Sequence, residues 1–384
     1  MLRRLRWVAP LAVAAVALGA CSSETGEAAE ENTEVSTQAD EALAELEGQV
    51  LAKGPRGEEP APASDAELTD DEVAQVREMG ATAAIVMHYG GNDWANAQIA
   101  GLRQRFEELG IEVVAVTDAD FDPGQQVSDL ETVMARNPDI IVSIPTDPVA
   151  TSAAYQAAAD AGVKLVFMDN VPDGLEPGTD YVSVVSADNY GNGVVSAHLM
   201  AKSLNGSGKI GLIYHEADFF VTQQRYEGFR TTIEDQYPDI EIVDERGIAG
   251  PDFAGDAQAV SDAWLTQYPD LDGIWAVWDV PAEGVMAAAR AAGRTDLKIA
   301  TEDLGTNVAI ALARGEMVVG LGAQVPFDQG VTEANLAAGA LLGKTAPPYV
   351  ALSALPVTHE NVLEAWEQVY HADPPSEVTD SYAD

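Results

Sequence analysis

From about residue 81 to residue 370, short runs of β-branched and other apolar residues alternate with longer, Ala-rich amphipathic stretches. The short runs have the length of buried strands, and the longer stretches repeat their apolar positions at helical spacing. Alternation of this kind is typical of βαβ units, in which helices cover a mostly parallel sheet. About 290 residues suffice for two such sheets or one large domain. The pattern therefore predicts an α/β body.

The predicted elements fall into two sets, before and after residues 188 and 189. The strands expected in the first set are 83–87, 112–117, 140–144, 164–168 and 181–185, with helices at 94–109, 124–136 and 148–161. The strands expected in the second set are 209–214, 240–246, 273–278, 298–301 and 318–323, with helices at 190–204, 222–236, 256–267, 281–292 and 307–314. A helix at 327–342 and a segment near 350–357 complete the body. The two sets look like two copies of one plan.

Polar and aromatic residues follow several of the predicted strands. In open α/β sheets, ligands bind beyond the carboxyl ends of the strands, so two facing sheets would line one cleft with these residues. Carboxylates and arginine form paired hydrogen bonds with adjacent hydroxyl groups, and aromatic faces pack against sugar rings. His88 and His215 also end strands. The candidate ligand-binding residues are Asn92, Trp94, Asp169, Asn170, Arg225, Trp278, Asp303 and Gln324.

Several short motifs resemble one known family between about residues 81 and 358. These motifs are Ile-Pro-Thr-Asp at 144–147, Met-Asp at 168–169, Ala-Asp-Asn at 187–189, Arg-Tyr-Glu-Gly-Phe at 225–229 and Ala-Gln at 323–324. Their order and spacing resemble the type I periplasmic binding proteins, in the branch that includes the ribose-binding protein. The fold class expected is α/β, with two doubly wound parallel-sheet lobes joined by a three-crossover hinge.

The resemblance implies how the chain is divided and where a ligand would lie. The N-terminal lobe would comprise residues 80–186 and 325–352, and the C-terminal lobe residues 187–324 and 353–371. The crossovers are expected near Ser186, Gln324 and Leu352. The family pattern adds Phe253 to the ligand-binding residues, where it would sandwich the ligand with Trp94.

Three positions depart from the ribose-type pattern. Ile144 replaces a usual Asn, Asn170 a usual Arg, and Trp278 a usual Asn. Two lost polar contacts and a larger aromatic wall disfavour ribose itself. A different pentose, a polyol, a cyclitol or a less polar small molecule fits better. The sequence does not identify the ligand or its affinity.

Other interpretations of the same residues are less specific. Asp169, Asp188 and Asp303 could simply cap helices. Residues 206–211 match G-x-G-x-x-G, but they precede a predicted strand, so we interpret them as a turn. Residues 118–122 resemble the start of a calcium loop, but Pro123 stands at the glycine position. The sequence therefore predicts no metal, no cofactor and no catalytic residues.

The first 21 residues have the layout of an export signal. A basic start is followed by an uncharged apolar run over 7–20, too short to favour spanning a bilayer, and by Cys21, the chain's one cysteine. The sequence Leu-Gly-Ala-Cys at 18–21 resembles the lipobox of bacterial lipoproteins, which implies a signal peptide at 1–20 and acylation of Cys21. An ordinary buried cysteine and an uncleaved membrane anchor are the alternatives.

The segments that flank the body are polar. Residues 21–79 are rich in Glu, Asp, Ala, Ser, Thr, Gly and Pro, which predicts an acidic disordered spacer with possible short helices at 41–51 and 68–79. Residues 372–384 are expected to be a disordered tail. Asp and Glu number 63 against 20 Lys and Arg, a net charge of −43. Such a surface repels phosphate backbones and anionic lipid, so nucleic acid is not an expected partner.

Together these features predict a lipid-anchored protein on the extracytoplasmic face of the cell membrane. It would capture a sugar, polyol or similar ligand and deliver it to an ABC permease, and we expect a monomer. A ligand-sensing receptor of the same fold, for an autoinducer-like or chemotactic signal, is the alternative, and the sequence does not separate the two well. An enzyme is disfavoured because no nucleophile motif or zinc motif occurs.

Overall fold

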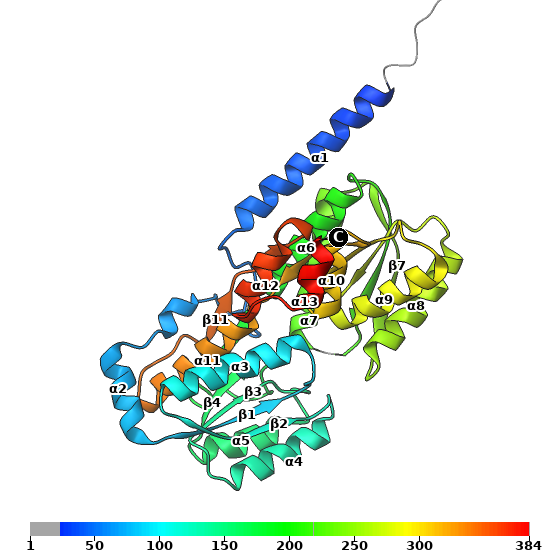
Figure 1. The fold of residues 1–384 in the computed structure, drawn as a ribbon. Helices are drawn as coiled ribbons and strands as arrows, with labels where there is room; N and C mark the ends of the chain where they lie inside the picture. The colour runs from blue at the N-terminus through cyan, green and yellow to red at the C-terminus, as the bar shows by residue number, and fades with distance from the viewer. Residues whose placement is uncertain (1–23, 218, 384) are drawn as a thin grey trace, which may run out of the picture.

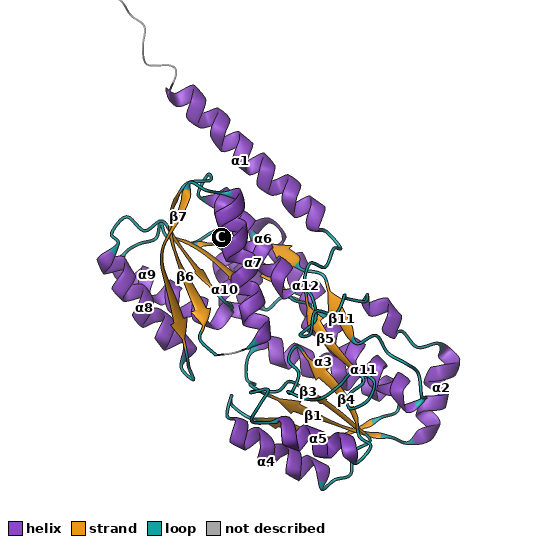
Figure 2. Cartoon of the chain, turned by 180° about the vertical axis from the view of Figure 1, so that it is seen from behind, coloured by secondary structure: helices purple, strands orange, loops and turns teal. Residues whose placement is uncertain are grey.

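The chain folds into two α/β lobes joined side by side (Figure 1). The structure is a computed structural model, and it describes residues 24–217 and 219–383. Each lobe is built on one six-stranded sheet with helices on both faces, as the view from behind shows (Figure 2). The signal segment and Cys21 lie outside the described residues.

The first lobe carries the sheet with strand order β11-β5-β4-β3-β1-β2, and all its pairings are parallel. Its strands are β1 (Thr82–Met87), β2 (Glu112–Asp118), β3 (Ile140–Ser143), β4 (Lys164–Met168), β5 (Ser183–Ala187) and β11 (Tyr349–Leu352). Its helices are α2 (Asp70–Met79), α3 (Asp93–Glu108), α4 (Pro123–Met134), α5 (Ser152–Asp160) and α11 (Pro326–Leu341). The central strands are apolar throughout because both faces of the sheet are covered.

The second lobe carries the sheet with strand order β12-β10-β9-β8-β6-β7, parallel except for β12. Its strands are β6 (Gly208–His215), β7 (Ile240–Ile248), β8 (Gly273–Ala276), β9 (Lys298–Glu302), β10 (Val318–Ala323) and β12 (Leu355–Val357). Its helices are α6 (Asn189–Ser203), α7 (Phe220–Gln236), α8 (Phe253–Gln267), α9 (Asp279–Ala292), α10 (Thr306–Ala313), α12 (Val362–Tyr370) and α13 (Ser376–Ala383). Residues 206–211 form a turn and the start of β6, as expected.

From β1 onward, the chain crosses between the lobes three times. It passes from β5 into α6, from β10 into α11, and from β11 into β12, next to Ser186, Gln324 and Leu352. The two doubly wound lobes and their three-crossover hinge are therefore confirmed.

Close helix packing fixes the position of α3, which begins at the cleft. A Cβ atom added at Gly101 of α3 would lie 2.1 Å from the backbone oxygen of Phe327 in α11. Gly330 of α11 is equally close to α3, with an added Cβ 2.5 Å from the backbone oxygen of Gln98. The two helices can approach this closely because glycine has no side chain.

The segment expected to be a disordered spacer is ordered in the structure from residue 24 onward. Residues 24–46 form α1 (Glu24–Leu46), which lies against α6, and residues 47–69 run across the hinge to the first lobe (Figure 1). Ala39 is fully buried, and Val35 packs on the core of the second lobe. Ala61 pairs with the edge strand β11. The expectation of disorder was wrong because this polar segment gains its order from contacts with distant residues.

The C-terminal tail also differs from expectation. Residues 376–383 form α13, which packs on α10, and Val378 is fully buried in the core of the second lobe. The ring of Tyr382 stacks on His359, with 4.9 Å between ring centroids. Val378 and Tyr382 therefore hold in place a segment whose composition alone suggested disorder.

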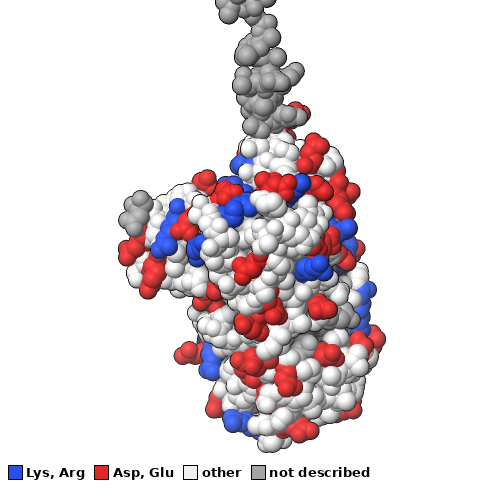
Figure 3. Space-filling model, turned by 90° about the vertical axis from the view of Figure 1, so that its right-hand side faces the viewer, with Lys and Arg blue, Asp and Glu red and all other residues white. Residues whose placement is uncertain are grey.

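Acidic side chains are spread over the face drawn in Figure 3, with fewer basic side chains between them. Among the helices that the structure describes, none combines the length and the apolar character needed to cross a membrane. The same residues contain no cluster of three or more His, Cys, Asp or Glu arranged to hold a metal ion.

Candidate ligand-binding cleft

A cavity of about 60 Å³ lies between the two lobes, beyond the carboxyl ends of their strands. It has room for only a few water molecules. A sugar-sized ligand therefore requires the side chains that line the cavity to move apart. The lining residues are His88, Tyr89, Asn92, Trp94, Phe121, Ile144, Asp169, His215, Phe219, Val221, Thr222, Arg225, Trp278, Asp279, Asp303 and Gln324.

Three of the lining residues have an unusual backbone conformation. Asp169 follows β4, Asp303 follows β9 and Phe121 follows β2, and their φ angles are 55°, 64° and 57°. This left-handed region is uncommon for residues other than glycine, especially bulky ones, and it is often found at functional sites. The conformation turns the chain at the strand end and presents each side chain to the cavity.

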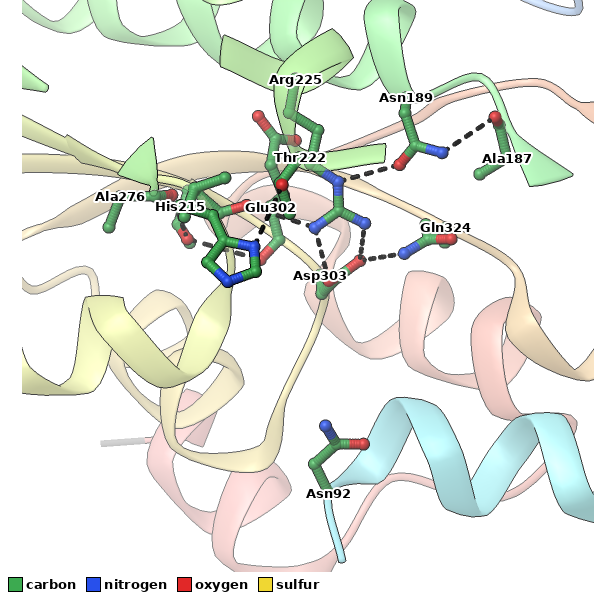
Figure 4. Close-up of polar contacts among 12 residues, drawn as sticks. Asn92, Ala187, Asn189, His215, Thr222, Arg225, Ala276, Glu302, Asp303 and Gln324 are labelled. Atoms are coloured by element: carbon green, nitrogen blue, oxygen red, sulfur yellow. Dashed lines mark hydrogen bonds and ion pairs between the residues drawn. The ribbon is translucent and has the colours of Figure 1, made fainter. Parts of the chain in front are cut away.

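A buried network centred on Arg225 of α7 forms the polar side of the cavity (Figure 4). The guanidinium Nη1 of Arg225 lies 2.9 Å from Asp303 Oδ2, and Arg225 Nε donates to Asn189 Oδ1 at 2.9 Å. Gln324 Nε2 donates to Asp303 Oδ1 at 2.8 Å. Arg225 is 3% exposed and Asp303 8%. The network holds both groups in place at the cleft before any ligand arrives.

Asp169 faces the cavity from the first lobe with few partners. Ser186 Oγ donates to its Oδ1 at 2.6 Å. Burial raises the pKa of Asp169 from 3.8 to about 6, although the Ser186 hydroxyl and the charge of Arg225 act in the opposite direction. With this pKa the group is still mostly ionised near pH 7, so it can accept hydrogen bonds from a ligand.

Aromatic and imidazole rings form the other side of the cavity and join the two lobes. His88 of the first lobe stacks on Phe219 of the second, with ring centroids 5.5 Å apart, and Phe121 lies 6.1 Å from His215. His215 in turn lies 5.5 Å from Trp278. Burial lowers the pKa of His88 to about 3 and that of His215 to about 4, so both imidazoles are neutral near pH 7.

Three polar atoms on the cavity wall have no hydrogen-bond partner among the described residues. They are His88 Nδ1, Trp94 Nε1 and Gln324 Oε1. Buried polar atoms in folded proteins are nearly always paired, so these atoms await a partner. The indole N–H needs an acceptor and the amide oxygen needs a donor. A hydroxyl group can serve as either.

Seven of the nine ligand-binding residues predicted from the sequence line the cavity, and two do not. Asn170 is buried and directs Nδ2 toward the backbone oxygen of Pro145 at 3.4 Å. Phe253 packs edge-on against Trp278, with 4.9 Å between ring centroids. The seven that line the cavity are Asn92, Trp94, Asp169, Arg225, Trp278, Asp303 and Gln324.

Asn92 stands apart from the Arg225 network, at the start of α3 (Figure 4). Its Oδ1 accepts a hydrogen bond from Ala95 N at 2.7 Å, so it caps this helix. The sequence analysis did not include Phe121, Phe219 or Asp279 among the ligand-binding residues. All three lie shortly after the end of a strand, and this position is the one feature of the sequence that could have identified them.

A hydrogen-bonded contact closes the cleft beside the cavity. Asp93 Oδ2, at the start of α3, accepts from both the backbone N (2.7 Å) and Oγ1 (2.8 Å) of Thr306, at the start of α10 in the other lobe. The carboxylate also lies at the positive end of α10, which favours a negative charge. This contact holds the lobes together.

Replacing Asp93 by alanine should weaken ligand binding about tenfold, because the closed form loses two hydrogen bonds to a carboxylate. Isothermal titration calorimetry would measure the dissociation constant. Thr306→Val, which removes only the hydroxyl and keeps the backbone donor, should have a smaller effect. Equal affinity in wild type and Asp93→Ala would show that this contact does not contribute to closure.

The raised pKa of Asp169 makes the stability of the unliganded protein depend on pH. Between pH 3.8 and about 6 the folded state binds this proton more tightly than the unfolded chain does, so stability falls as pH rises through that window. Asp169→Asn should remove this loss and be more stable than wild type by up to about 3 kcal/mol at pH 7. Urea unfolding at pH 7 and below pH 4 tests this: an equal difference at both pH values contradicts it.

Comparisons with known proteins agree with this geometry. Residues 83–345 match the family described as "Periplasmic binding protein domain". A Rhizobium meliloti protein described as rhizopine-binding is 28% identical over 207 residues, 53% of this chain and 66% of that relative. The ribose import binding protein RbsB of Bacillus subtilis is 26% identical over 226 residues, 59% of this chain and 70% of the relative.

Solved structures share the fold over most of the chain. An ABC transporter solute-binding protein from Agrobacterium vitis with bound allitol is 25% identical, with a TM-score of 0.66, and the match covers 74% of this chain and 98% of that one. The family match covers more than half of the 384 residues, and the resemblance seen in the sequence is confirmed. The chain therefore belongs to the periplasmic binding protein domain family, as a solute-binding protein rather than an enzyme.

Proposed function

We propose that this protein is a lipid-anchored, extracytoplasmic solute-binding protein that captures a sugar or polyol between its lobes and delivers it to an ABC importer. The observation that carries the proposal is the pairing of an Arg225–Asp303 network with three unpartnered polar atoms of residues that line the same cavity. A ligand with several hydroxyl groups satisfies these atoms. The relatives named for ribose import and bound to allitol support the same ligand class.

The lobes would close on the ligand by rotation about the three crossovers. Aromatic rings from both lobes meet at the cavity and would cover the C–H faces of the ligand, while the carboxylates and Arg225 would take its hydroxyl groups. The closed form, with Asp93 bonded to Thr306, is the form that a permease would recognise.

A thermal-shift screen tests the ligand class. The mature chain, carrying Cys21→Ser so that it remains in solution, would be heated with pentoses, hexoses, polyols and cyclitols. A ligand at 100 times its dissociation constant adds about 2.7 kcal/mol of stability, which gives a clear rise in Tm. If the protein unfolds cooperatively but no compound of this panel raises its Tm, sugar or polyol binding is contradicted.

The anchor is proposed from the sequence around Cys21, which the described residues do not include. The 23-residue helix α1 follows shortly after it and spans about 35 Å, so it would hold the lobes away from the membrane. In a bacterial host, the full chain should appear in the membrane fraction and incorporate labelled fatty acid, and Cys21→Ser should do neither. Membrane retention of the Cys21→Ser chain would contradict the proposed anchor.

A further inference from the structure

The charges around the cavity are not balanced. Among the described residues, three carboxylates line it, Asp169, Asp279 and Asp303, against one guanidinium, Arg225. The two lining imidazoles, His88 and His215, are neutral near pH 7 and supply no charge.

The guanidinium of Arg225 already has partners within the protein. It pairs with Asp303 at 2.9 Å, and its remaining donors reach Asn189 Oδ1 at 2.9 Å and the backbone oxygen of Val277 at 3.2 Å. Asp303 also accepts from Gln324. Arg225 therefore neutralises Asp303 and leaves the other two carboxylates without an ion pair among the described residues.

Asp169 and Asp279 differ in what surrounds them. Asp279 lies in the first turn of α9, and burial together with the charges of Asp303 and Glu283 raises its pKa well above the ordinary value, which favours its uncharged form. Asp169 has one side-chain partner, the neutral hydroxyl of Ser186, and the residue after it is Asn170 rather than a cation. Asp169 is 2% exposed, so its charge is poorly solvated as well as unpaired.

Ring faces surround the same small space. Phe121, Phe219 and Trp278 line it with His88 and Trp94, and contacts between the rings join them into one wall. Aromatic faces attract cations, most strongly where water is excluded. In a cavity of about 60 Å³, a bound group lies near both the carboxylate and the rings.

We propose that the ligand is an amino polyol, with a protonated amine that pairs with Asp169 between the aromatic faces and hydroxyl groups that bind the Arg225 network. This inference rests on the proposed function and narrows its ligand class. A neutral polyol would leave the Asp169 carboxylate without a compensating positive charge when the lobes close. The protein therefore binds such a ligand less tightly. An ammonium group brings the missing charge.

Matched pairs of ligands test the inference by calorimetry on the mature chain carrying Cys21→Ser, at pH 7. Each pair joins an amino compound to its hydroxyl parent: glucosamine and glucose, galactosamine and galactose, scyllo-inosamine and scyllo-inositol. The tightest-binding amino compound should bind at least ten times more tightly than its parent, and N-acetylation should remove that advantage, because the amide is neutral.

The possible outcomes separate the two proposals. If a hydroxyl parent binds as tightly as its amino partner or more tightly, the amine proposal is overturned and the polyol function stands. If no compound of the panel binds, both are overturned.

Asp169→Asn tests the named carboxylate. The ratio of amine affinity to parent affinity should fall about tenfold in this variant, and it should fall less in Asp279→Asn, which replaces the other carboxyl group of the cavity that has no ion pair among the described residues. The Tm of each variant would be measured alongside, so that a loss of folding is recognised. An unchanged ratio in Asp169→Asn would overturn the assignment of the amine to this side chain.

Discussion

Replacing Arg225 by alanine should abolish ligand binding and also lower the free energy of unfolding by about 3–5 kcal/mol. The guanidinium is 3% exposed and its loss leaves Asp303 as a buried carboxylate whose remaining side-chain partner is Gln324. Desolvated charge without a partner is among the most costly features in a folded protein. Calorimetry with the ligand found in the screen and urea unfolding would measure the two effects.

Arg230 provides the matched control for this prediction. It lies on the same helix, α7, and pairs with Glu234 and Glu245, but its side chain is 40% exposed. Exposed ion pairs contribute about 0–1 kcal/mol, so Arg230→Ala should change stability little and leave ligand binding as it is. If the two alanine variants lost equal stability, or if Arg225→Ala still bound ligand, the central role of the Arg225 network would be refuted.

The strand-end positions of the site were predictable because topology alone places them. Asp169 and Asp303 directly follow buried strands, and parallel sheets bring such residues to one edge. Gln324 follows β10 at the second crossover in the same way. For these residues, the apolar run that directly precedes them in the sequence is enough to predict that they lie at the end of a strand.

The aromatic side of the cleft was less predictable. Phe121 belongs to an acidic loop that the sequence suggested only as an improbable calcium site, and its side chain reaches the cavity through a backbone φ of 57°. Phe253 was expected to contact the ligand but is not among the residues that line the cavity, and its ring packs against those of Trp278, Phe121 and His215. Side-chain direction in loops depends on tertiary packing, which periodicity does not encode.

The ordered structure of the N-terminal segment could not be predicted from its local sequence either. Its composition favours disorder, yet the backbone N–H groups of Leu51 and Ala52 donate to Asp188 at 2.7 and 2.8 Å, more than 130 residues away. Ala61 exchanges backbone hydrogen bonds with Tyr349 and Ala351 of β11. Composition does not register contacts with residues far along the chain, and this segment is held by its polar contacts with Asp188 and β11 as well as by the packing of Val35 and Ala39 on the second lobe.

Asp188→Ala should therefore release the N-terminal segment and lower the free energy of unfolding by about 3 kcal/mol. The carboxylate is 1% exposed and accepts from the backbone N–H groups of Leu51, Ala52 and Gly191; by the bond from Gly191, Asp188 caps α6. Each hydrogen bond to a buried charged group contributes about 1.5–3 kcal/mol, and part of this is offset when the freed donors meet water. Urea unfolding would measure the loss.

Asp252→Ala is the control, because the carboxylate of Asp252 caps α8 in the same way, by accepting from Gly255 N, but Asp252 is exposed. Its loss should cost about 1 kcal/mol. Trypsin gives a second measurement, since Lys53 and Arg56 lie directly after the Asp188 contact and should be cut much faster in Asp188→Ala than in wild type or Asp252→Ala.

Equal cleavage rates in all three proteins would mean that the segment is held elsewhere, for instance at β11. Faster cleavage in Asp188→Ala alone would place the attachment at the first crossover, between Ala187 of β5 and Asn189 of α6. Since the lobes rotate about these crossovers, the segment that leads back toward Cys21 would then be fastened to the hinge itself. Closure on a ligand and the position of the N-terminal helix would be mechanically linked.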